Sequence, residues 1–300
     1  MIPISRERPE TPSPEEIMAR PVTISMPHDL GGEEAQRRIR DGFEKVAGKI
    51  GFGSEFEQRW DGDTLHFDAK AFGMTAQEIM GWIDFGGGQE LWDELSSQFG
   101  VKAFQAANSG HQMGGWFRKE INSLDDLVGL KMRIPGQGGD VLRALGGSSI
   151  AIPGGEIYQS LQTGAIDATE WVGPWNDYYL GFYREAPYYY GPGFHEPGSS
   201  LACGINRRVW DSFSPGEQAV VKAACESVNH TSLGEFTYQN SVHLDMLVNE
   251  HGVQLRTFPP EVVSAMAEAA WDVRAASGKD GIEKRIYESF EKSLKLMRGW

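Results

Sequence analysis

The segment from residue 131 to residue 172 constrains the fold most, because short apolar strands and short helices alternate along it. The expected elements in chain order are a strand at 131–134, a helix at 140–145 ended by Gly146 and Gly147, a strand at 149–152, a helix at 156–163 ended by Gly164, and a strand at 166–172. Strands separated by helices of this length need crossover connections, which are typical of parallel pairing. The segment therefore predicts an α/β fold with a mostly parallel sheet.

Elements of both kinds flank this segment. Upstream, the pattern predicts a helix at 89–99, strands at 101–107 and 113–117, and a short helix at 124–128. Downstream, it predicts a helix opened by the capping sequence Ser214-Pro215-Gly216-Glu217, a second helix at 233–250, a strand at 253–258 and a helical tail after Pro259-Pro260. An apolar stripe at helical spacing marks the end of this tail: Ile282, Ile286, Phe290, Leu294 and Met297. The stripe must dock on its own chain or on a second one.

The first 85 residues differ in character from the rest. Residues 1–20 are rich in Pro and Glu and contain no apolar run, which predicts a disordered tail without a signal peptide. On that basis the chain as written is expected to remain in the cytoplasm. Residues 21–85 predict a small α+β unit with a strand at 22–26, a helix at 33–47 and a hairpin that turns at Asp61-Gly62. A unit of this size needs a partner surface, because it buries little apolar area alone.

Composition argues against two classes of partner. The 28 Lys and Arg residues against 42 Asp and Glu residues give a net charge of −14, which repels nucleic-acid phosphates. No apolar run approaches the roughly 18 residues of a membrane span, so direct membrane insertion is not expected. Cys203 and Cys225 are the only cysteines, and we interpret them as small buried apolar side chains, with one disulfide as the alternative.

The usual signatures of an enzyme are missing from the sequence. Its seven histidines show no metal-binding spacing, and each is interpreted as a surface or satisfied core residue. Gly136-Gln137-Gly138-Gly139 follows a strand but lacks the full dinucleotide-binding pattern, which favours a tight strand-to-helix turn. The chain is therefore not expected to be an enzyme, and polarisation of a keto group by an arginine with carboxylates is the weaker alternative.

A set of polar and aromatic residues lies at expected strand ends, where open α/β sheets bind ligands. Its members are Gln112, Arg133, Glu170, Trp171 and Glu196. Arg133 ends a strand that is expected to be buried, so its guanidinium needs an anionic partner. That partner is either Glu170 or Glu196 in an internal ion pair, or the carboxylate of a ligand. The residues alone leave both alternatives open.

Several long motifs around these residues resemble one known family. They are FGMT at 72–75, GGGQELWDEL at 86–95, MGGWFRKEI at 113–121, GLKMRIPG at 129–136 and PGGEIYQSLQTGAIDATEWVGP at 153–174. In this order they resemble the solute-binding proteins of TRAP (tripartite ATP-independent periplasmic) transporters, in the branch that binds 2-oxo acids and related monocarboxylates. The resemblance runs from about residue 72 to residue 300.

The resemblance implies a two-lobed periplasmic-binding-protein-like fold with a hinge, a second lobe at about 123–206 and long C-terminal helices at 259–300. It implies that Gln112, Arg133 and Trp171 bind the substrate, with Arg133 on its carboxylate. It also implies that Gln112, Glu170, Trp171 and Glu196 hold a cation, sodium in the first instance and calcium as the alternative. Oxygen donors of this kind suit a small hard cation. Trp116 and Trp171 are expected to form apolar walls of the site, with packing in the core as the alternative.

The family further implies partners and a compartment. These are a small carboxylate ligand such as pyruvate, the membrane components of a TRAP transporter, the periplasm, and a homodimer that exchanges its C-terminal helix. For the stripe at 282–297, the alternative is a helix folded back on its own lobe.

The N-terminal part departs from the family pattern. Residues 21–72 resemble the polyhydroxyalkanoate-granule-associated family, through PHDLG at 27–31 and WDGD at 60–63. The chain is therefore interpreted as a chimera with a junction at about 72–86, whose first lobe is N-terminally incomplete and replaced by a small β-α-β-β unit. The alternative function is a cytosolic accessory protein of such granules, with a non-functional transporter-derived remainder.

Overall fold

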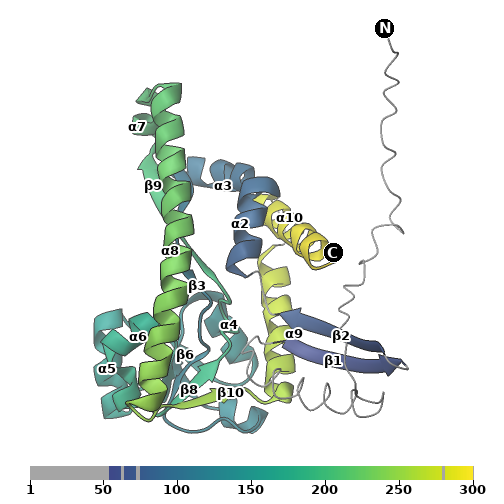
Figure 1. The fold of residues 1–300 in the computed structure, drawn as a ribbon, viewed down its shortest axis with the longest axis vertical. Helices are drawn as coiled ribbons and strands as arrows, with labels where there is room; N and C mark the ends of the chain where they lie inside the picture. Colours follow the sequence, from purple (N-terminus) through teal and green to yellow (C-terminus); the bar gives the residue numbers. More distant parts are fainter. Residues whose placement is uncertain (1–53, 62–63, 72–74, 279–280, 300) are drawn as a thin grey trace, which may run out of the picture.

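The alternation of strands and helices expected over 131–172 is present in the computed structural model, which describes residues 54–61, 64–71, 75–278 and 281–299 (Figure 1). The tail expected at 1–20, the strand at 22–26 and the helix at 33–47 lie outside the described residues. In chain order the elements are β1 (Ser54–Asp61), β2 (Thr64–Ala71), α2 (Ala76–Phe85), α3 (Gly88–Ser97), β3 (Val101–Gly110), β4 (Gly115–Phe117), the 3-10 turn η1 (Leu124–Leu127), β5 (Lys131–Arg133), α4 (Gly136–Ala144), β6 (Ser148–Ile150), α5 (Gly154–Thr163), β7 (Ala168–Thr169), α6 (Pro174–Leu180), the 3-10 turn η2 (Phe182–Arg184), β8 (Tyr188–Gly191), β9 (Ser199–Asn206), α7 (Arg207–Ser212), α8 (Pro215–Asn249), β10 (Gln254–Thr257), α9 (Pro260–Ser277) and α10 (Gly281–Arg298). The sequence pattern assigned no element to α2, α6, β8, β9 or α7.

The main sheet has six strands in the order β10-β8-β4-β7-β5-β6. β5 runs parallel to β6 and β7, and β8 runs parallel to β10, whereas β4 is antiparallel to both of its neighbours. The expectation of a mostly parallel sheet was therefore wrong in its centre. β4 is followed in the chain by β5, with which it does not pair, so no single crossover connection fixes its direction relative to β7 and β8.

Two apolar cores cover the two faces of this sheet. One core joins the sheet to α4 and α9, and the other joins it to α5, η2 and the C-terminal end of α8. Side chains of adjacent residues in a strand point to opposite faces, so Phe117 of β4 lies in the first core and Trp116 in the second. We call the six-stranded sheet with α4, α5, α6, α9 and residues 233–249 of α8 the sheet lobe.

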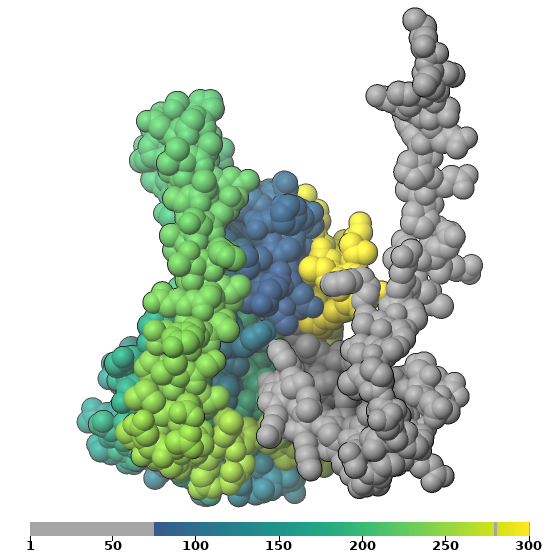
Figure 2. Space-filling view, viewed as in Figure 1, coloured from purple at the N-terminus to yellow at the C-terminus, as the bar shows by residue number. Residues whose placement is uncertain are grey.

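A second, smaller sheet extends away from the sheet lobe. It contains only β3 and β9, which pair antiparallel, and α8 packs along β3. We call β3, β9, α7 and residues 215–232 of α8 the arm, whose upper end projects as a narrow column beyond the other described elements (Figure 2).

The long helix α8 replaces two helices that the sequence predicted. The expected capping box is present, since the Ser214 hydroxyl accepts a hydrogen bond from the backbone nitrogen of Glu217. The helix then continues through Gly234 to residue 249. A glycine inside a helix costs about 1 kcal/mol, and the packing of α8 along β3 outweighs that cost.

The N-terminal hairpin is confirmed by the pairing of β1 with β2, in which Asp61 lies opposite Thr64. It forms a sheet of its own and contacts α9. The hairpin therefore extends neither the six-stranded sheet nor the β3–β9 pair.

The C-terminal tail consists of two helices, α9 and α10, and α10 lies against α2 and α3 of the same chain. The indole nitrogen of Trp82 donates to the Ser289 hydroxyl at 3.0 Å, the rings of Trp82 and Phe290 meet edge to face, and Leu294 is buried. Within this single chain, the apolar stripe is therefore covered by its own α2 and α3. None of the helices in the described residues is both long and apolar enough to cross a membrane.

Candidate functional site

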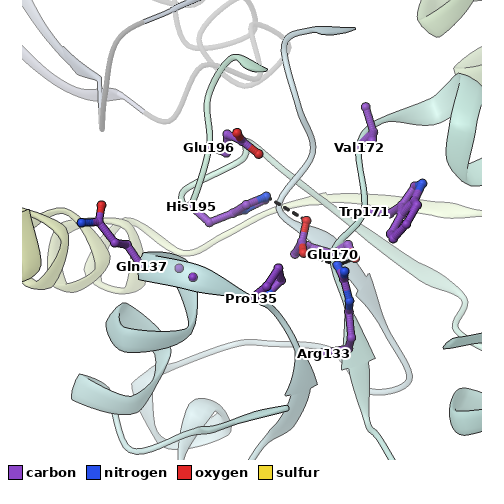
Figure 3. A pocket seen from close by; sticks show the side chains of 10 residues that line it. Arg133, Pro135, Gln137, Glu170, Trp171, Val172, His195 and Glu196 are labelled. Atoms are coloured by element: carbon purple, nitrogen blue, oxygen red, sulfur yellow. Dashed lines mark hydrogen bonds and ion pairs between the residues drawn. The ribbon is translucent and has the colours of Figure 1, made fainter. Parts of the chain in front are cut away.

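A pocket of about 380 Å³ lies where β5 and β7 end at the edge of the sheet lobe (Figure 3). Its lining consists of Arg133, Pro135, Gly136, Gln137, Gly138, Glu170, Trp171, Val172, His195 and Glu196. Four of the five residues expected at the site are thus brought together from segments far apart in sequence. The fifth, Gln112, does not line the pocket but donates a hydrogen bond to Glu196, which does.

Arg133 is the last residue of β5, and its side chain is 12% exposed. Its terminal nitrogen Nη1 donates to the carboxylate of Glu170 at 2.5 Å and to the backbone oxygen of the same residue at 3.2 Å. Its Nε donates to the backbone oxygen of Ile152, and the guanidinium lies 5.0 Å from the Trp171 ring. Of the partners that the sequence left open, the structure therefore shows the internal ion pair with Glu170.

His195 is a member of the site that the sequence analysis missed. Its side chain is 7% exposed, and its Nε2 lies 3.1 Å from the second carboxylate oxygen of Glu170. The direction of this approach is poor for a hydrogen bond, and neither ring nitrogen has a hydrogen-bond partner among the described residues. The only signal in the sequence was its position directly before Glu196.

Gln112 and Glu196 form the second polar part of the site. The amide nitrogen of Gln112 donates to the carboxylate of Glu196 at 3.2 Å. The amide oxygen of Gln112 is buried and has no partner in the described structure. Gly193 holds the two segments together, because its nitrogen donates to the Gln112 backbone oxygen and a Cβ at this position would meet that oxygen at 2.9 Å. The free amide oxygen is a donor atom of the kind a cation requires.

The two tryptophans expected as walls have different positions. Trp171 lines the pocket beside Gly154, where a Cβ would meet the indole at 2.6 Å. Trp116 is fully buried in the sheet lobe and stacks on Tyr189 with ring centroids 3.9 Å apart. Of the two alternatives for Trp116 the structure therefore shows packing in the core, because β4 is a central strand whose faces are both covered by core.

The glycine-rich segment after β5 leads into a helix as expected, but it forms the first turn of α4 itself and not a turn before the expected helix at 140–145. Helix α4 begins at Gly136, which has a φ of 62°. A Cβ at Gly138 would meet the Cβ of His195 at 2.6 Å. These glycines therefore allow α4 to approach the wall of the pocket closely.

The buried carboxylate of Asp177 supports the pocket wall at Val172. Asp177 accepts hydrogen bonds from Trp116, from Tyr189 and from the backbone nitrogens of Val172 and Gly173. Burial raises the pKa of Asp177 to about 6, although these hydrogen bonds act in the opposite direction. By holding residues 172 and 173, Asp177 positions the segment that directly follows Trp171.

The charges of the pocket decide which ligands fit it. Arg133 contributes one positive charge, and Glu170 and Glu196 contribute one negative charge each, so their sum is −1. A carboxylate ligand would add a further negative charge beside two carboxylates. A cation bound among these oxygens would offset that repulsion. No three His, Cys, Asp or Glu side chains in the described part of the chain are arranged to hold a metal ion, so a cation here would depend on the Gln112 oxygen as well.

The family model that matches this chain is that of the bacterial extracellular solute-binding proteins, family 7, over residues 60–278. A curated relative, the monocarboxylate 2-oxoacid-binding periplasmic protein of Nostoc sp., is 39% identical over 230 residues. The match covers 76% of this chain and 63% of the relative, so the chain spans less than two thirds of that protein's length.

Solved structures of TRAP solute-binding proteins are similar as well. The protein from Pseudoalteromonas atlantica, with bound sodium and pyruvate, is 41% identical with a TM-score of 0.72, over 76% of this chain and 70% of that one. The protein from Colwellia psychrerythraea, with bound calcium and pyruvate, is 34% identical with a TM-score of 0.73, over 88% and 75%. The protein from Bordetella bronchiseptica, a dimer with calcium and picolinate, is 39% identical with a TM-score of 0.73, over 76% and 68%.

These similarities confirm the expected fold class and the resemblance over the larger part of the chain. The resemblance of residues 21–72 to granule-associated proteins stays a prediction. The chain belongs to family 7 of the bacterial extracellular solute-binding proteins.

Proposed function

We propose that this chain captures a small monocarboxylate, a 2-oxo acid such as pyruvate, together with a cation, for the membrane components of a TRAP transporter. The observation that carries the proposal is the convergence of Arg133, Glu170, Trp171 and Glu196 on one pocket, with Gln112 bonded to Glu196. Relatives that are 34% and 41% identical hold pyruvate with calcium or sodium. Because the chain spans 63% of the curated relative, ligand and partners remain proposals for this protein.

In this proposal Arg133 binds the carboxylate of the ligand and Trp171 forms an apolar wall. Glu170 and Glu196, with the oxygens of Gln112 and Trp171, would hold the cation, sodium first and calcium as the alternative. The buried, unpartnered Gln112 oxygen supports this donor set. The cation would supply charge compensation, so that an anionic ligand can lie beside two carboxylates.

The proposed activity is binding and not catalysis, as in the family to which the chain belongs. The alternative of a granule-associated accessory protein depends on residues 21–72, most of which lie outside the described residues, and no comparison supports it. The division into a tail at 1–20, a small unit at 21–85 and a solute-binding part at 86–300 is likewise a proposal. The family model begins at residue 60, before the proposed junction.

Calorimetry with pyruvate, in the presence and absence of sodium or calcium, tests the proposal. The Arg133→Ala variant should lose about 2–5 kcal/mol of binding free energy, because the charge-assisted hydrogen bonds to the carboxylate are removed. Arg118→Ala, at an exposed arginine outside the pocket, is the matched control and should bind like the unchanged protein. Equal binding by Arg133→Ala, or binding that ignores the cation, would contradict the proposal.

We also propose a homodimer that exchanges α10. The contacts of α10 with α2 and α3 are available to an identical helix from a second copy, so exchange would reuse the same contacts at little cost. One similar structure is a dimer. Light scattering on the full chain and on a chain truncated before Gly278 tests this, and a dimer that survives truncation would contradict it.

The compartment is tested separately. The family is extracellular and the curated relative is periplasmic, so we propose the periplasm for this protein. Fractionation of cells that express it tests the proposal, and recovery from the cytoplasm alone would contradict it.

A further inference from the structure

Arg133 and Glu170 form a buried ion pair inside the candidate site. Their side chains are 12% and 5% exposed, and Nη1 of Arg133 donates to the Glu170 carboxylate at 2.5 Å (Figure 3). Their backbones are fixed as well, since Arg133 pairs with Thr169 in the sheet and the backbone nitrogen of Glu170 donates to the backbone oxygen of Arg133. The two side chains can therefore separate by rotating while the strands stay paired.

Most of the hydrogen-bonding capacity of the Arg133 guanidinium is already in use. Its Nε donates to the backbone oxygen of Ile152, and Nη1 donates to both the backbone oxygen and the carboxylate of Glu170, whereas Nη2 has no partner among the described residues. A guanidinium holds a carboxylate most strongly through two nitrogens at once. Of the three acceptors, only the Glu170 carboxylate can turn away, because the other two are backbone oxygens. A ligand carboxylate bound by both Nη1 and Nη2 therefore has to displace Glu170 from Nη1.

We propose that Glu170 is a positioning residue that occupies Arg133 in place of the ligand carboxylate until a cation binds. The inference rests on the proposed function, in which Glu170 is one of the residues that hold the cation. In the structure, the Glu170 carboxylate has Arg133 as its positive partner. When this carboxylate turns to a cation, Nη1 becomes free to join Nη2 in holding the ligand. Glu170 thus makes capture of the carboxylate depend on capture of the cation.

The other side chains proposed for the cation are not held in this way. Glu196 accepts a hydrogen bond from the neutral amide of Gln112, and the Gln112 amide oxygen is buried without a partner in the described structure. The second carboxylate oxygen of Glu170 lies 3.1 Å from Nε2 of His195, but the direction is poor for a hydrogen bond. Glu170 is therefore the member of the donor set whose release from a present partner breaks a charged pair with Arg133.

The cation and the ligand carboxylate compete with this ion pair from its two ends. A cation competes with Arg133 for Glu170, and a ligand carboxylate competes with Glu170 for Arg133. Each therefore lowers the cost of binding the other, and linkage requires both affinities to rise by the same factor. Calcium should give a larger factor than sodium, because it carries twice the charge.

Calcium binding without any carboxylate tests the first half of this competition. Calorimetry compares the unchanged protein with Arg133→Gln, in which the ion pair no longer holds Glu170, so we expect calcium to bind about tenfold tighter. Removal of a positive charge also favours a cation through space. The control for that effect is the same change in a Glu170→Gln background, where we expect a gain of less than about threefold. This double variant removes both charges of the buried pair and leaves neither one unpaired.

Pyruvate binding in a buffer free of sodium and calcium tests the second half. Glu170→Gln should bind pyruvate about tenfold tighter than the unchanged protein, because the neutral amide competes weakly for Arg133. Glu196→Gln removes an equal charge from the pocket without breaking a bond to Arg133, and should gain less than about threefold. A merely structural role for Glu170 predicts the opposite sign, since a distorted site binds its ligand more weakly.

Two results would overturn the inference. One is calcium that binds Arg133→Gln no more tightly than the unchanged protein, and the other is an equal cation-free affinity for pyruvate in Glu170→Gln and Glu196→Gln. If no protein binds pyruvate while the calcium result is as expected, the proposed ligand is wrong and the competition at Glu170 is supported. Circular dichroism checks the folding of each variant, and if Glu170→Gln does not fold, calcium binding by Arg133→Gln decides alone.

Discussion

The sheet lobe and the arm differ in how completely their side chains are covered. The central strands of the sheet lobe bury Trp116 and Tyr189 fully, at 0% exposure. In the arm, Val220 is 70% exposed and Val228 53% exposed. The described structure also leaves buried amide atoms of Gln105, Asn108 and Asn229 without partners there. The side-chain oxygen of Asn176 in α6 of the sheet lobe is likewise without a partner among the described residues, so the two regions differ in exposure and not in the pairing of buried polar groups.

This difference in burial shows which parts of the candidate site rest on a well-packed core. All of the pocket residues belong to the sheet lobe or to the loop between β8 and β9. The arm contributes β3, whose end leads to Gln112, and β9, which begins shortly after Glu196. Eight of the ten lining residues therefore stand on the sheet lobe, and the loop that carries the other two, His195 and Glu196, leads into the arm.

The largest expected effect is a loss of stability when a side chain is removed from the core of the sheet lobe. Trp116→Ala removes a side chain that stacks on Tyr189 and donates to Asp177, so we expect it to cost about 3–5 kcal/mol of the free energy of unfolding. Urea unfolding followed by circular dichroism measures this. A loss below about 1 kcal/mol would show that the sheet lobe is not the well-packed region.

The next effect compares one ion pair from each region. Glu170→Gln leaves the Arg133 charge nearly buried without a carboxylate, so we expect a loss of about 3 kcal/mol and a weaker dependence of ligand binding on sodium. Asp93→Asn in α3 removes the partner of Lys102 in the arm, and the aspartate is 33% exposed whereas the lysine side chain is 11% exposed. Because water reaches this pair through the aspartate, we expect a smaller loss, of about 1–2 kcal/mol. Equal losses in urea unfolding would remove this distinction.

The titration of Asp177 makes the stability of the sheet lobe depend on pH. Its pKa is raised from 3.8 to about 6, so between these values the folded protein binds more protons at this site than the unfolded chain. Its contribution to the free energy of unfolding therefore falls as the pH rises from 4 to 6, by at most about 3 kcal/mol, and is constant above that range. Asp177→Asn should lack this dependence. Unfolding of both proteins at a series of pH values checks it, and a wild type that gains stability relative to the variant over this range would contradict it.

The smallest expected effect lies on the open side of the arm. Val220→Lys places a charge at an exposed position of α8, so we expect a change within about 0.5 kcal/mol in urea unfolding. Val262→Lys, at a fully buried position of α9, is the matched control and should unfold the protein. A large loss for Val220→Lys would mean that another part of the chain or a second copy covers the arm.

Local signals account for the parts of the fold that were predicted correctly. The strand and helix alternation over 131–172, the hairpin and the Ser214 cap all depend on residues a few positions apart. The antiparallel β4 and the single helix α8 were missed, because strand direction and helix continuity depend on packing against distant segments.

The candidate site divides in the same way. The sequence by itself placed Gln112, Arg133, Glu170, Trp171 and Glu196 at strand ends and indicated their chemistry, since residue type and motif order are local properties. Only the tertiary structure decided that Arg133 pairs with Glu170, that His195 joins them, and that Trp116 belongs to the core. These contacts depend on which segments lie side by side in the folded chain. Burial and ion pairing arise from contacts between residues far apart in sequence, so a short stretch of sequence does not determine them.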